Sequence, residues 1–419
     1  MSEQAPDMTQ EDRATTLQRV VTALYYLSLA FLLFSIYNKS ATALNNIGLY
    51  LPILLWPLRR AMGANPGHYL RDPLLLRAFA FVALLGLSCL WSPDAHESLS
   101  RFRKEVAAVL ILALTFAEAG HDRRTLQRWC VVLVVAAAWM AGLDVRDWWS
   151  SWKVDGNLLP AYGFLRDYGY GIVFALPFLF VVREFSGSRI RRLIGMLILV
   201  LAVLVVVTGS RGSWFAFAAI MAGCGVFLHV RRAAIAMIFA ALCAALLFVW
   251  IEPANPITAN VGRGVDSSYR RMGAWVPAAT MMAERPALGF GYGKYVFDDQ
   301  YNGRKPDHPE WELAYSMGPH SLYFEAGFAA GLPGLAALIF LVAGFVQRAW
   351  SLSRGEPGWR RSMARAVLLS FTGQYLIYGF IESISWQPLG VQLGLLLALT
   401  ASMAGAQEAV RSSGDRAGR

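Results

Sequence analysis

The sequence is poor in charge for its length. Asp, Glu, Lys and Arg together make up 16% of the 419 residues, whereas hydrophobic residues make up 56%. A typical soluble domain carries about 25% charged residues. The composition therefore excludes an ordinary soluble protein and predicts an integral membrane protein with a modest soluble portion.

Cysteine is scarce as well. The four cysteines lie in apolar runs, and none forms a Cys-x-x-Cys pair; they are Cys89, Cys130, Cys224 and Cys243. This pattern excludes a disulfide framework and a zinc site built on cysteine pairs. We interpret the four residues as small side chains that face the core or the lipid.

A cleavable export signal is also lacking. The first twenty or so residues are polar, and no small-residue cleavage site follows the first apolar run. A secretory signal needs that site. We therefore expect the first apolar run to remain as an uncleaved membrane helix.

The net charge of +10 does not point to nucleic acid. The basic residues are scattered through short loops between apolar runs, instead of forming one basic domain. That distribution is typical of membrane orientation and of contact with anionic lipid. We predict membrane lipid as a partner and no nucleic acid.

Long apolar runs dominate the chain. A membrane-spanning helix needs roughly 20 mostly apolar residues. The fold class predicted is an all-α integral membrane protein with about 12 transmembrane helices. The candidate segments are 20–37, 41–58, 74–92, 104–119, 126–148, 165–183, 189–208, 212–230, 232–252, 333–350, 362–381 and 388–404.

The loop charges predict the sidedness and the organisation of the chain. Alternate loops are rich in Arg, and both termini fall on that side, so the N and C termini are predicted to be cytoplasmic. Residues 1–252 would form an N-terminal bundle of about nine helices, and 332–405 the C-terminal membrane helices. Residues 253–331 would form a periplasmic loop or cap containing short helices, and 406–419 a disordered cytoplasmic tail.

Several basic residues lie on the outer side and violate the orientation bias. Arg103 and Lys104 lie at the expected outer start of a span, where a helix N-terminus already favours anions. They can be headgroup anchors or part of a functional site, and both interpretations stay open here.

Two further outer groups favour a function. Arg211 is the single charge of a turn at 208–214 whose glycines allow a sharp bend. Arg270 and Arg271 lie in a segment expected to form a capped helix over the membrane. Arginine grips phosphate through two parallel hydrogen bonds, so we expect these arginines to bind an anionic, lipid-linked substrate.

His320 stands where the long outer stretch meets a membrane segment. With Ser321 it begins a run in which nine residues precede Gly331 and two more precede Gly334. This run resembles the His-[Asn/Ser/Gln]-x9-Gly-x2-Gly pattern of the O-antigen ligase and related polymerase superfamily. Residues 208–214 are similar to that family's Ser-Arg turn.

A third segment completes the resemblance. Arg271, three residues and Trp275, followed by Glu-Arg-Pro-Ala-Leu-Gly-Phe-Gly-Tyr-Gly at 284–293, are similar to the family's Arg-x3-Trp and glycine-rich stretch. The spacing favours Arg271 over Arg270 as the family arginine. The glycines lack the strand and the βαβ unit of a dinucleotide site, and we expect them to fold the loop tightly against the cap.

The resemblance implies a glycosyltransferase of the bacterial inner membrane, with its active site facing the periplasm. The donor would be an O-antigen glycan on undecaprenyl diphosphate, and the acceptor the lipid A–core oligosaccharide, which gives complete lipopolysaccharide. An O-antigen polymerase and a protein O-glycosylating enzyme of the same superfamily remain alternatives. A multi-span transporter is the alternative from another class.

The residues suggest how such a reaction could run. No Asp-x-Asp motif lies in an outer loop, so we predict no metal and no cofactor, with Arg211 and Arg271 clamping the diphosphate. Arg103 or Lys104 would assist. His320 is the candidate general base, because histidine titrates near neutral pH. Alternatively, His320 binds phosphate and the base is Glu325 or Asp266.

Overall fold

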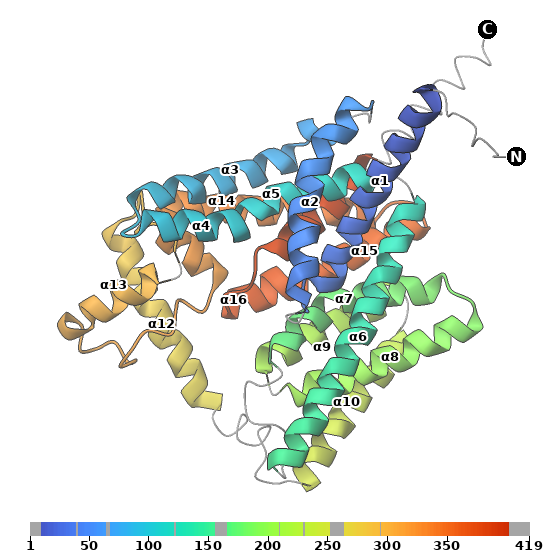
Figure 1. Ribbon diagram of the computed structural model, residues 1–419. Helices are drawn as coiled ribbons and strands as arrows, with labels where there is room; N and C mark the ends of the chain where they lie inside the picture. Colours follow the sequence, from blue (N-terminus) through green and yellow to red (C-terminus); the bar gives the residue numbers. More distant parts are fainter. Residues whose placement is uncertain are drawn as a thin grey trace, which may run out of the picture.

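The computed structural model describes residues 10–38, 41–63, 68–120, 123–155, 166–208, 210–228, 231–251, 264–293 and 295–401. Within these ranges the protein is built from helices without a strand, which confirms the all-α expectation (Figure 1). The first half contains α1 (Gln10–Ser35), α2 (Thr42–Ala61), η2 (His68–Arg71), α3 (Pro73–Ser88), η3 (Cys89–Trp91), α4 (Ala95–Glu105), α5 (Ala107–Ala119), α6 (Arg123–Asp155) and α7 (Arg166–Glu184).

The second half continues with helices and one π-helical segment. Its elements are α8 (Ser188–Val207), α9 (Arg211–Phe227), α10 (Arg231–Ile251), α12 (Gly264–Glu284), α13 (Val296–Arg304), η4 (Lys305–Asp307), α14 (Leu322–Ser353), α15 (Trp359–Phe371), the π-helix η5 (Thr372–Tyr378) and α16 (Gly379–Ile381). A last helix spans Gln387–Ala401.

Every predicted membrane segment coincides with a helix, but the count of twelve spans stays a prediction. Five described helices are long and apolar enough to cross a membrane: Thr16–Ser35, Pro73–Trp91, Arg123–Val154, Ser188–Val207 and Leu322–Ser353. Two shorter apolar helices are Arg211–Phe227 and Gln387–Ala401. The structure starts α14 at Leu322, well before the predicted start at 333, because the helix continues across a kink at Ala330 and Gly331.

Side-chain caps fix where several helices begin. The Asp72 carboxylate accepts a hydrogen bond from the backbone N–H of Leu74 at 2.8 Å, and Pro73 occupies the first turn of α3. Asp94 caps α4 in the same way through the N–H of Glu97, at 2.9 Å. These local signals set the helix ends around which the apolar faces then pack.

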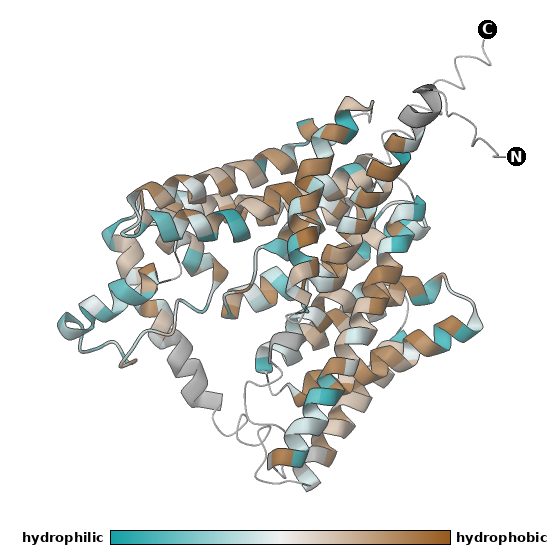
Figure 2. Ribbon diagram, in the orientation of Figure 1, coloured by the Kyte–Doolittle hydropathy of each residue, from teal (hydrophilic) through white to brown (hydrophobic). Residues whose placement is uncertain are grey.

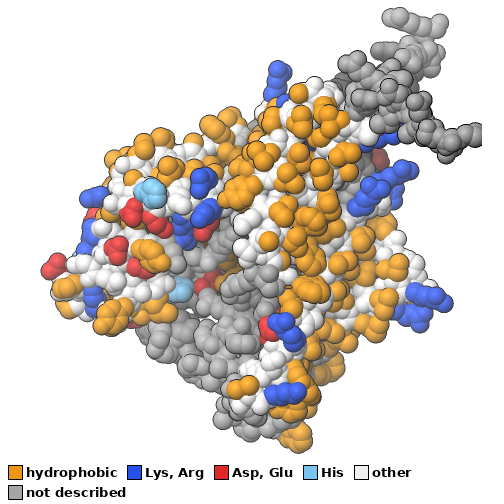
Figure 3. Space-filling model, in the orientation of Figure 1, with side chains coloured by type: hydrophobic (Ala, Val, Ile, Leu, Met, Phe, Trp, Pro, Cys, Tyr) orange, Lys and Arg blue, Asp and Glu red, His pale blue; other side chains and the backbone are white. Residues whose placement is uncertain are grey.

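The helices bury two large apolar clusters and expose many apolar side chains to their surroundings. One cluster joins α1, α3, α5, α14, α15 and the last helix, and the other joins α6, α7, α8 and α9. Hydrophobic residues dominate these helices, while hydrophilic ones gather at their ends and around α13 (Figure 2). Figure 3 shows hydrophobic side chains over much of the face in view. Leu76 and Phe239 are among the large hydrophobic side chains that are exposed. An apolar exterior suits lipid.

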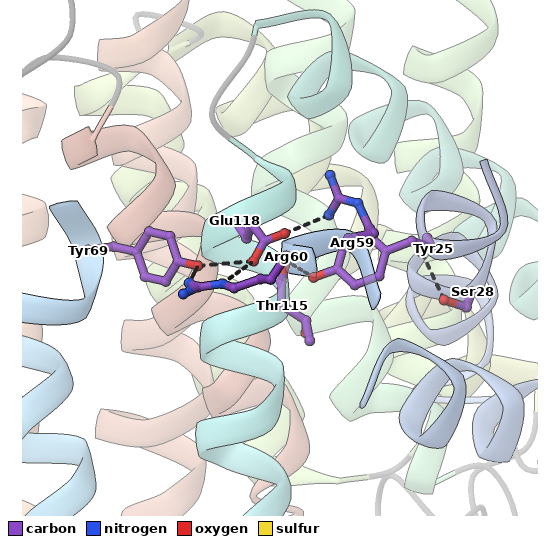
Figure 4. A network of polar contacts seen from close by, with 7 residues as sticks. All are labelled: Tyr25, Ser28, Arg59, Arg60, Tyr69, Thr115 and Glu118. Atoms are coloured by element: carbon purple, nitrogen blue, oxygen red, sulfur yellow. Dashed lines mark hydrogen bonds and ion pairs between the residues drawn. The ribbon is translucent and has the colours of Figure 1, made fainter. Parts of the chain in front are cut away.

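A buried ionic network ties α2, η2 and α5 together (Figure 4). The Glu118 carboxylate pairs with Arg59 at 2.8 Å and with Arg60 at 3.8 Å, and it accepts a hydrogen bond from the Tyr69 hydroxyl at 3.2 Å. The Arg59 guanidinium also lies 4.3 Å from the centre of the Tyr25 ring. The orientation bias alone explains neither arginine, because both contribute to the packing of the bundle.

Candidate active site

His320 is held in an unusual backbone conformation directly before α14. Its φ of 45° makes it the single non-glycine residue with positive φ among the described residues. Its carbonyl accepts a hydrogen bond from the Trp275 indole at 3.4 Å, and its Nδ1 lies 3.0 Å from a carboxylate oxygen of Glu382. Left-handed backbone in a non-glycine residue is costly and concentrates at functional sites.

The imidazole faces a cavity of about 560 Å³. Ionisable side chains from four separate parts of the chain line it: Arg101 from α4, Asp298 from α13, Glu325 from α14 and Glu382 after α16. Glu382 is 6% exposed, so its carboxylate is largely removed from water. A cavity of this volume lies within the range of small-molecule sites, roughly 300–1,000 Å³.

Asp298 fixes the loop that carries His320. Its Oδ1 accepts hydrogen bonds from the Ser316 hydroxyl at 2.5 Å and from the backbone N–H of Gly318 at 3.1 Å. Gly318 has a φ of 77°, which favours glycine. Asp298 therefore anchors the turn two residues before His320, and the loop presents the imidazole at a defined place.

The glycine-rich stretch and the kink of α14 form one unit. At the kink, α14 leaves the carbonyls of Phe328 and Ala329 without their helical partners, and the N–H groups of Phe290 and Gly291 donate to them at 2.8 and 2.9 Å. A side chain on Gly289 would lie 2.4 Å from the Phe328 carbonyl oxygen. The expected tight folding of this loop is confirmed, and its partner is the kinked helix.

A small apolar core connects α12 and α13 to α14. Phe290 stacks on Phe328 with ring centres 5.0 Å apart, and Phe297 packs against the edge of the same ring. Met281 and Trp311 are buried in this cluster. Helices α12 and α13 and the start of α14 are thereby joined in one packed unit next to His320.

Arg211 begins α9, whose first turn packs on the segment that leads to Glu382. The Ser210 side chain caps α9, and the Ser210 and Ser213 hydroxyls both hydrogen-bond with the Tyr378 hydroxyl. A side chain on Gly212 would lie 3.0 Å from Ile381. Because Tyr378 and Ile381 directly precede Glu382, the Arg211 turn and the His320–Glu382 pair share one scaffold.

The segment 100–106 contributes a different residue from those expected. Arg103 and Lys104 lie in the last turn of α4 and are exposed, so the expected position at a helix N-terminus is wrong. Arg101 lines the cavity instead and pairs with Glu105 at 3.1 Å. Burial opposes the charge of the Arg101 guanidinium, but the Glu105 carboxylate outweighs it and raises the Arg101 pKa.

Tyr292 lines the His320 cavity beside Arg101. Its hydroxyl donates to the Glu105 carboxylate at 3.0 Å. Burial, together with the neighbouring carboxylate, raises the pKa of the Tyr292 phenol well above its ordinary value. The phenol therefore stays protonated and remains a hydrogen-bond donor.

The other predicted site residues lie outside the described side chains. Arg270, Arg271 and Asp266 belong to α12, but the structure describes side chains of that helix only from Gly273 onward. Residue 271 precedes Trp275 by one turn of α12, and the Trp275 indole contacts the His320 backbone. The predicted Arg271 segment and the His320 loop therefore adjoin through Trp275.

The sequence predicted no metal site and no disulfide framework. In the part of the chain that the structure describes, no three His, Cys, Asp or Glu side chains form a cluster that could hold a metal ion. The four cysteines are free, as expected; Cys243 is exposed, and Cys89, Cys130 and Cys224 are buried. Independence from metal remains a prediction.

Glu382 was not anticipated from the sequence. It lies 62 residues from His320 along the chain, so no local motif joins the two. The available signal was a carboxylate at the end of an otherwise apolar segment, in Gly-Phe-Ile-Glu-Ser at 379–383. Charged residues at membrane depth are functional candidates.

Comparison with known proteins supplies the family. Residues 194–339 match the family model described as O-antigen ligase. Over this segment the chain is similar to the O-antigen ligase family. The chain is also 28% identical to the O-antigen ligase of Salmonella typhimurium (strain LT2) over 349 residues, which cover 77% of this chain and 82% of that protein.

The resemblance found in the sequence is therefore confirmed. The matched segment contains Arg211, Arg271 and His320, whereas Glu382 lies beyond its end. The likeness implies an enzyme of the glycosyltransferase type, a multi-pass membrane protein, and substrates that are glycans and lipid-linked molecules in general.

Proposed function

We propose that the protein is an O-antigen ligase that transfers a glycan from undecaprenyl diphosphate to the lipid A–core oligosaccharide on the periplasmic face of the inner membrane. The observation that carries this proposal is the His320–Glu382 pair, 3.0 Å apart and facing the 560 Å³ cavity. The likeness to the Salmonella typhimurium O-antigen ligase supports the choice of substrates.

In this proposal His320 is the general base. Glu382 accepts a hydrogen bond from Nδ1, which leaves Nε2 to take the proton of an acceptor hydroxyl. The carboxylate then stabilises the imidazolium that forms, as the acidic member of a catalytic triad does. Glu325, the alternative base, lines the same cavity from the first turn of α14, the helix that follows His320.

The bond changes follow from this arrangement. The acceptor oxygen attacks the anomeric carbon of the donor as His320 removes its proton, and the bond between that carbon and the diphosphate oxygen breaks. The electron pair leaves with undecaprenyl diphosphate. A single displacement inverts the anomeric carbon, so a product that keeps the donor configuration would contradict the mechanism.

The developing negative charge needs a cationic environment. Asp298, Glu325 and Glu382 make the described His320 cavity rich in carboxylates, which repel phosphate. We place the diphosphate on the Arg211 side of the segment 378–382, where Arg211 and Arg271 would grip it and the α9 N-terminus favours anions. Metal-independent transfer follows from this choice and is part of the proposal.

A reconstituted transfer assay tests the function. Purified protein is given undecaprenyl-diphosphate-linked glycan and lipid A–core in the presence of EDTA, and ligated product is measured. We expect transfer by the wild type. We expect losses of about 100- to 1,000-fold in Arg211→Ala and Arg271→Ala, and of about 100- to 10,000-fold in His320→Ala.

Matched controls separate a site effect from a general one. His96→Ala and Arg192→Ala change the same residue types at exposed positions and should keep wild-type rates. Transfer that EDTA abolishes would refute metal independence. A lengthened glycan, or glycan on protein, in place of ligated lipid A–core would point to the polymerase or the protein-glycosylating alternative.

A further inference from the structure

A second cavity adjoins the His320 cavity and has a different chemistry. It measures about 380 Å³ and lies between the end of α1, the start of α2, and the segment 383–387. Tyr170 of α7 and Ser383 line both cavities, so the two share a wall. Ser383 directly follows Glu382, the carboxylate that pairs with His320.

The lining of this second cavity is polar and uncharged. Of its twelve described lining residues, ten carry a hydroxyl or a carboxamide, and the remaining two are Ile36 and Ile384. The His320 cavity, in contrast, is lined by Arg101 and three carboxylates. An anion would find no cationic partner among these described lining residues, and a hydrocarbon chain would make no use of their hydrogen-bonding groups.

Part of the lining is fixed before any ligand binds. The Tyr37 hydroxyl donates to the Gln374 carboxamide oxygen at 2.5 Å, and the Gln374 amide donates to the Tyr170 carbonyl at 2.6 Å. Gln374 is buried and belongs to the π-helix, whose last residue, Tyr378, contacts the Arg211 turn. One π-helical segment thus connects the uncharged cavity with the proposed diphosphate site; π-helical segments are rare and frequent at functional sites.

We infer that this uncharged cavity is a sugar subsite, which binds a neutral ring of a substrate glycan next to the bond that His320 acts on. The inference rests on the proposed function. Hydroxyls and carboxamides donate and accept hydrogen bonds, as sugar hydroxyls require, and the Tyr37 and Tyr170 rings offer apolar surface for a sugar face. A glycan with one ring at His320 can place its next ring in the uncharged cavity, because the two cavities share Tyr170 and Ser383.

Two substrates could supply that ring, because both carry sugars with the same hydrogen-bonding groups. The donor carries its glycan on the lipid diphosphate, and the acceptor carries the core oligosaccharide. The experiment therefore needs separate titrations of the two substrates, because only the substrate whose ring occupies the subsite loses affinity when a lining residue changes.

Asn45 and Asn46 provide a matched pair for this test. Asn45 lines the cavity, whereas its neighbour Asn46 on α2 is exposed and does not. We expect Asn45→Leu to lower kcat/KM for one substrate by about 2- to 10-fold per hydrogen bond lost, and Asn46→Leu to change nothing. Thr42→Val, which removes one hydroxyl from the lining and keeps the shape of the side chain, should affect the same substrate.

The titrations show which substrate supplies the ring, and they separate failure of the subsite from failure of the ligase proposal. A raised KM for lipid A–core assigns the subsite to the acceptor, and a raised KM for the lipid-linked glycan, with unchanged binding of undecaprenyl diphosphate that carries no sugar, assigns it to the donor. Equal kinetics of Asn45→Leu, Thr42→Val and Asn46→Leu in both titrations would overturn the subsite while leaving the ligase proposal standing.

A binding measurement covers the case in which the wild type transfers nothing. That result refutes the proposed function, but the soluble glycans released from either substrate can still be tested for binding to the purified protein. Weaker glycan binding by Asn45→Leu than by Asn46→Leu then supports a sugar subsite in a protein of another activity. Equal binding by the two variants overturns it.

Discussion

Arg59 and His320 both pair with a buried glutamate, but at opposite ends of the helix bundle and in different surroundings. Along α2, Asn45 of the uncharged cavity and Arg59 of the ionic network are about 20 Å apart, at 1.5 Å per residue. The Glu118 carboxylate contacts two arginines and the Tyr69 hydroxyl, and both guanidinium groups lie against aromatic rings. Glu382 and His320 instead line a cavity of about 560 Å³.

The difference separates charges that hold helices together from charges that are available to a substrate. Around Glu118 the partners come from α2, η2 and α5, so the network joins helices. His320 has a strained backbone conformation, and contacts from Trp275, Asp298 and Glu382 hold the residue and its loop in place. A site that stores strain and faces a cavity is arranged for chemistry, and the two ends should respond differently to the same substitution.

Among the substitutions that compare the two ends, Glu382→Gln is expected to affect catalysis most. The amide keeps the size of the side chain but removes the charge that stabilises the imidazolium and orients Nδ1. We expect the transfer rate to fall about 100- to 10,000-fold, with little change in thermal unfolding. The measurement is the reconstituted transfer rate, normalised to folded protein by size-exclusion chromatography.

Glu356→Gln is the control for that variant, because Glu356 is exposed in the turn between α14 and α15. It should keep the wild-type rate and melting temperature. If Glu382→Gln transferred glycan as fast as Glu356→Gln, the pair with His320 would have no catalytic part, and the contrast between the two ends would be lost.

The same change at the other end should act on stability. Glu118→Gln leaves Arg59, whose side chain is 9% exposed, beside a neutral partner. Removing one member of a buried ion pair destabilises by about 3–5 kcal/mol. We expect a clearly lower melting temperature in detergent, and a transfer rate per folded molecule within about threefold of the wild type. A loss of activity at unchanged stability would show that this end also serves the reaction.

How much of the fold and of the site could be predicted from the sequence depended on how far apart along the chain the contacting residues lie. Each apolar run predicted from the sequence coincides with a helix, because long apolar stretches can be recognised from local composition alone. The 284–293 stretch and Gly331 were each recognised by similarity, but their contact, made through the carbonyls of Phe328 and Ala329 at a kink, was not predicted. Glu382 and the uncharged cavity depend on contacts between distant segments, which no local pattern encodes.

The smallest effect concerns α4, where the phase of the helix decides which cation faces the cavity. Ser98, Arg101 and Glu105 follow helical spacing on the inner face, whereas Arg103 and Lys104 lie on the exposed face. The sequence prediction began the helix near residue 104 and placed Arg103 and Lys104 at its N-terminus, whereas α4 begins at Ala95 and holds both residues in its last turn.

We expect Arg101→Ala to lower kcat/KM about tenfold, because it removes a cavity cation and frees the Glu105 carboxylate. Arg103→Ala and Lys104→Ala should lower it less than about threefold, as expected of exposed charges. Initial rates at low and high salt test this, since the effect of an exposed charge fades with ionic strength while that of Arg101 should persist. A larger loss in Arg103→Ala than in Arg101→Ala would mean that the diphosphate binds on the outer face of α4, away from His320.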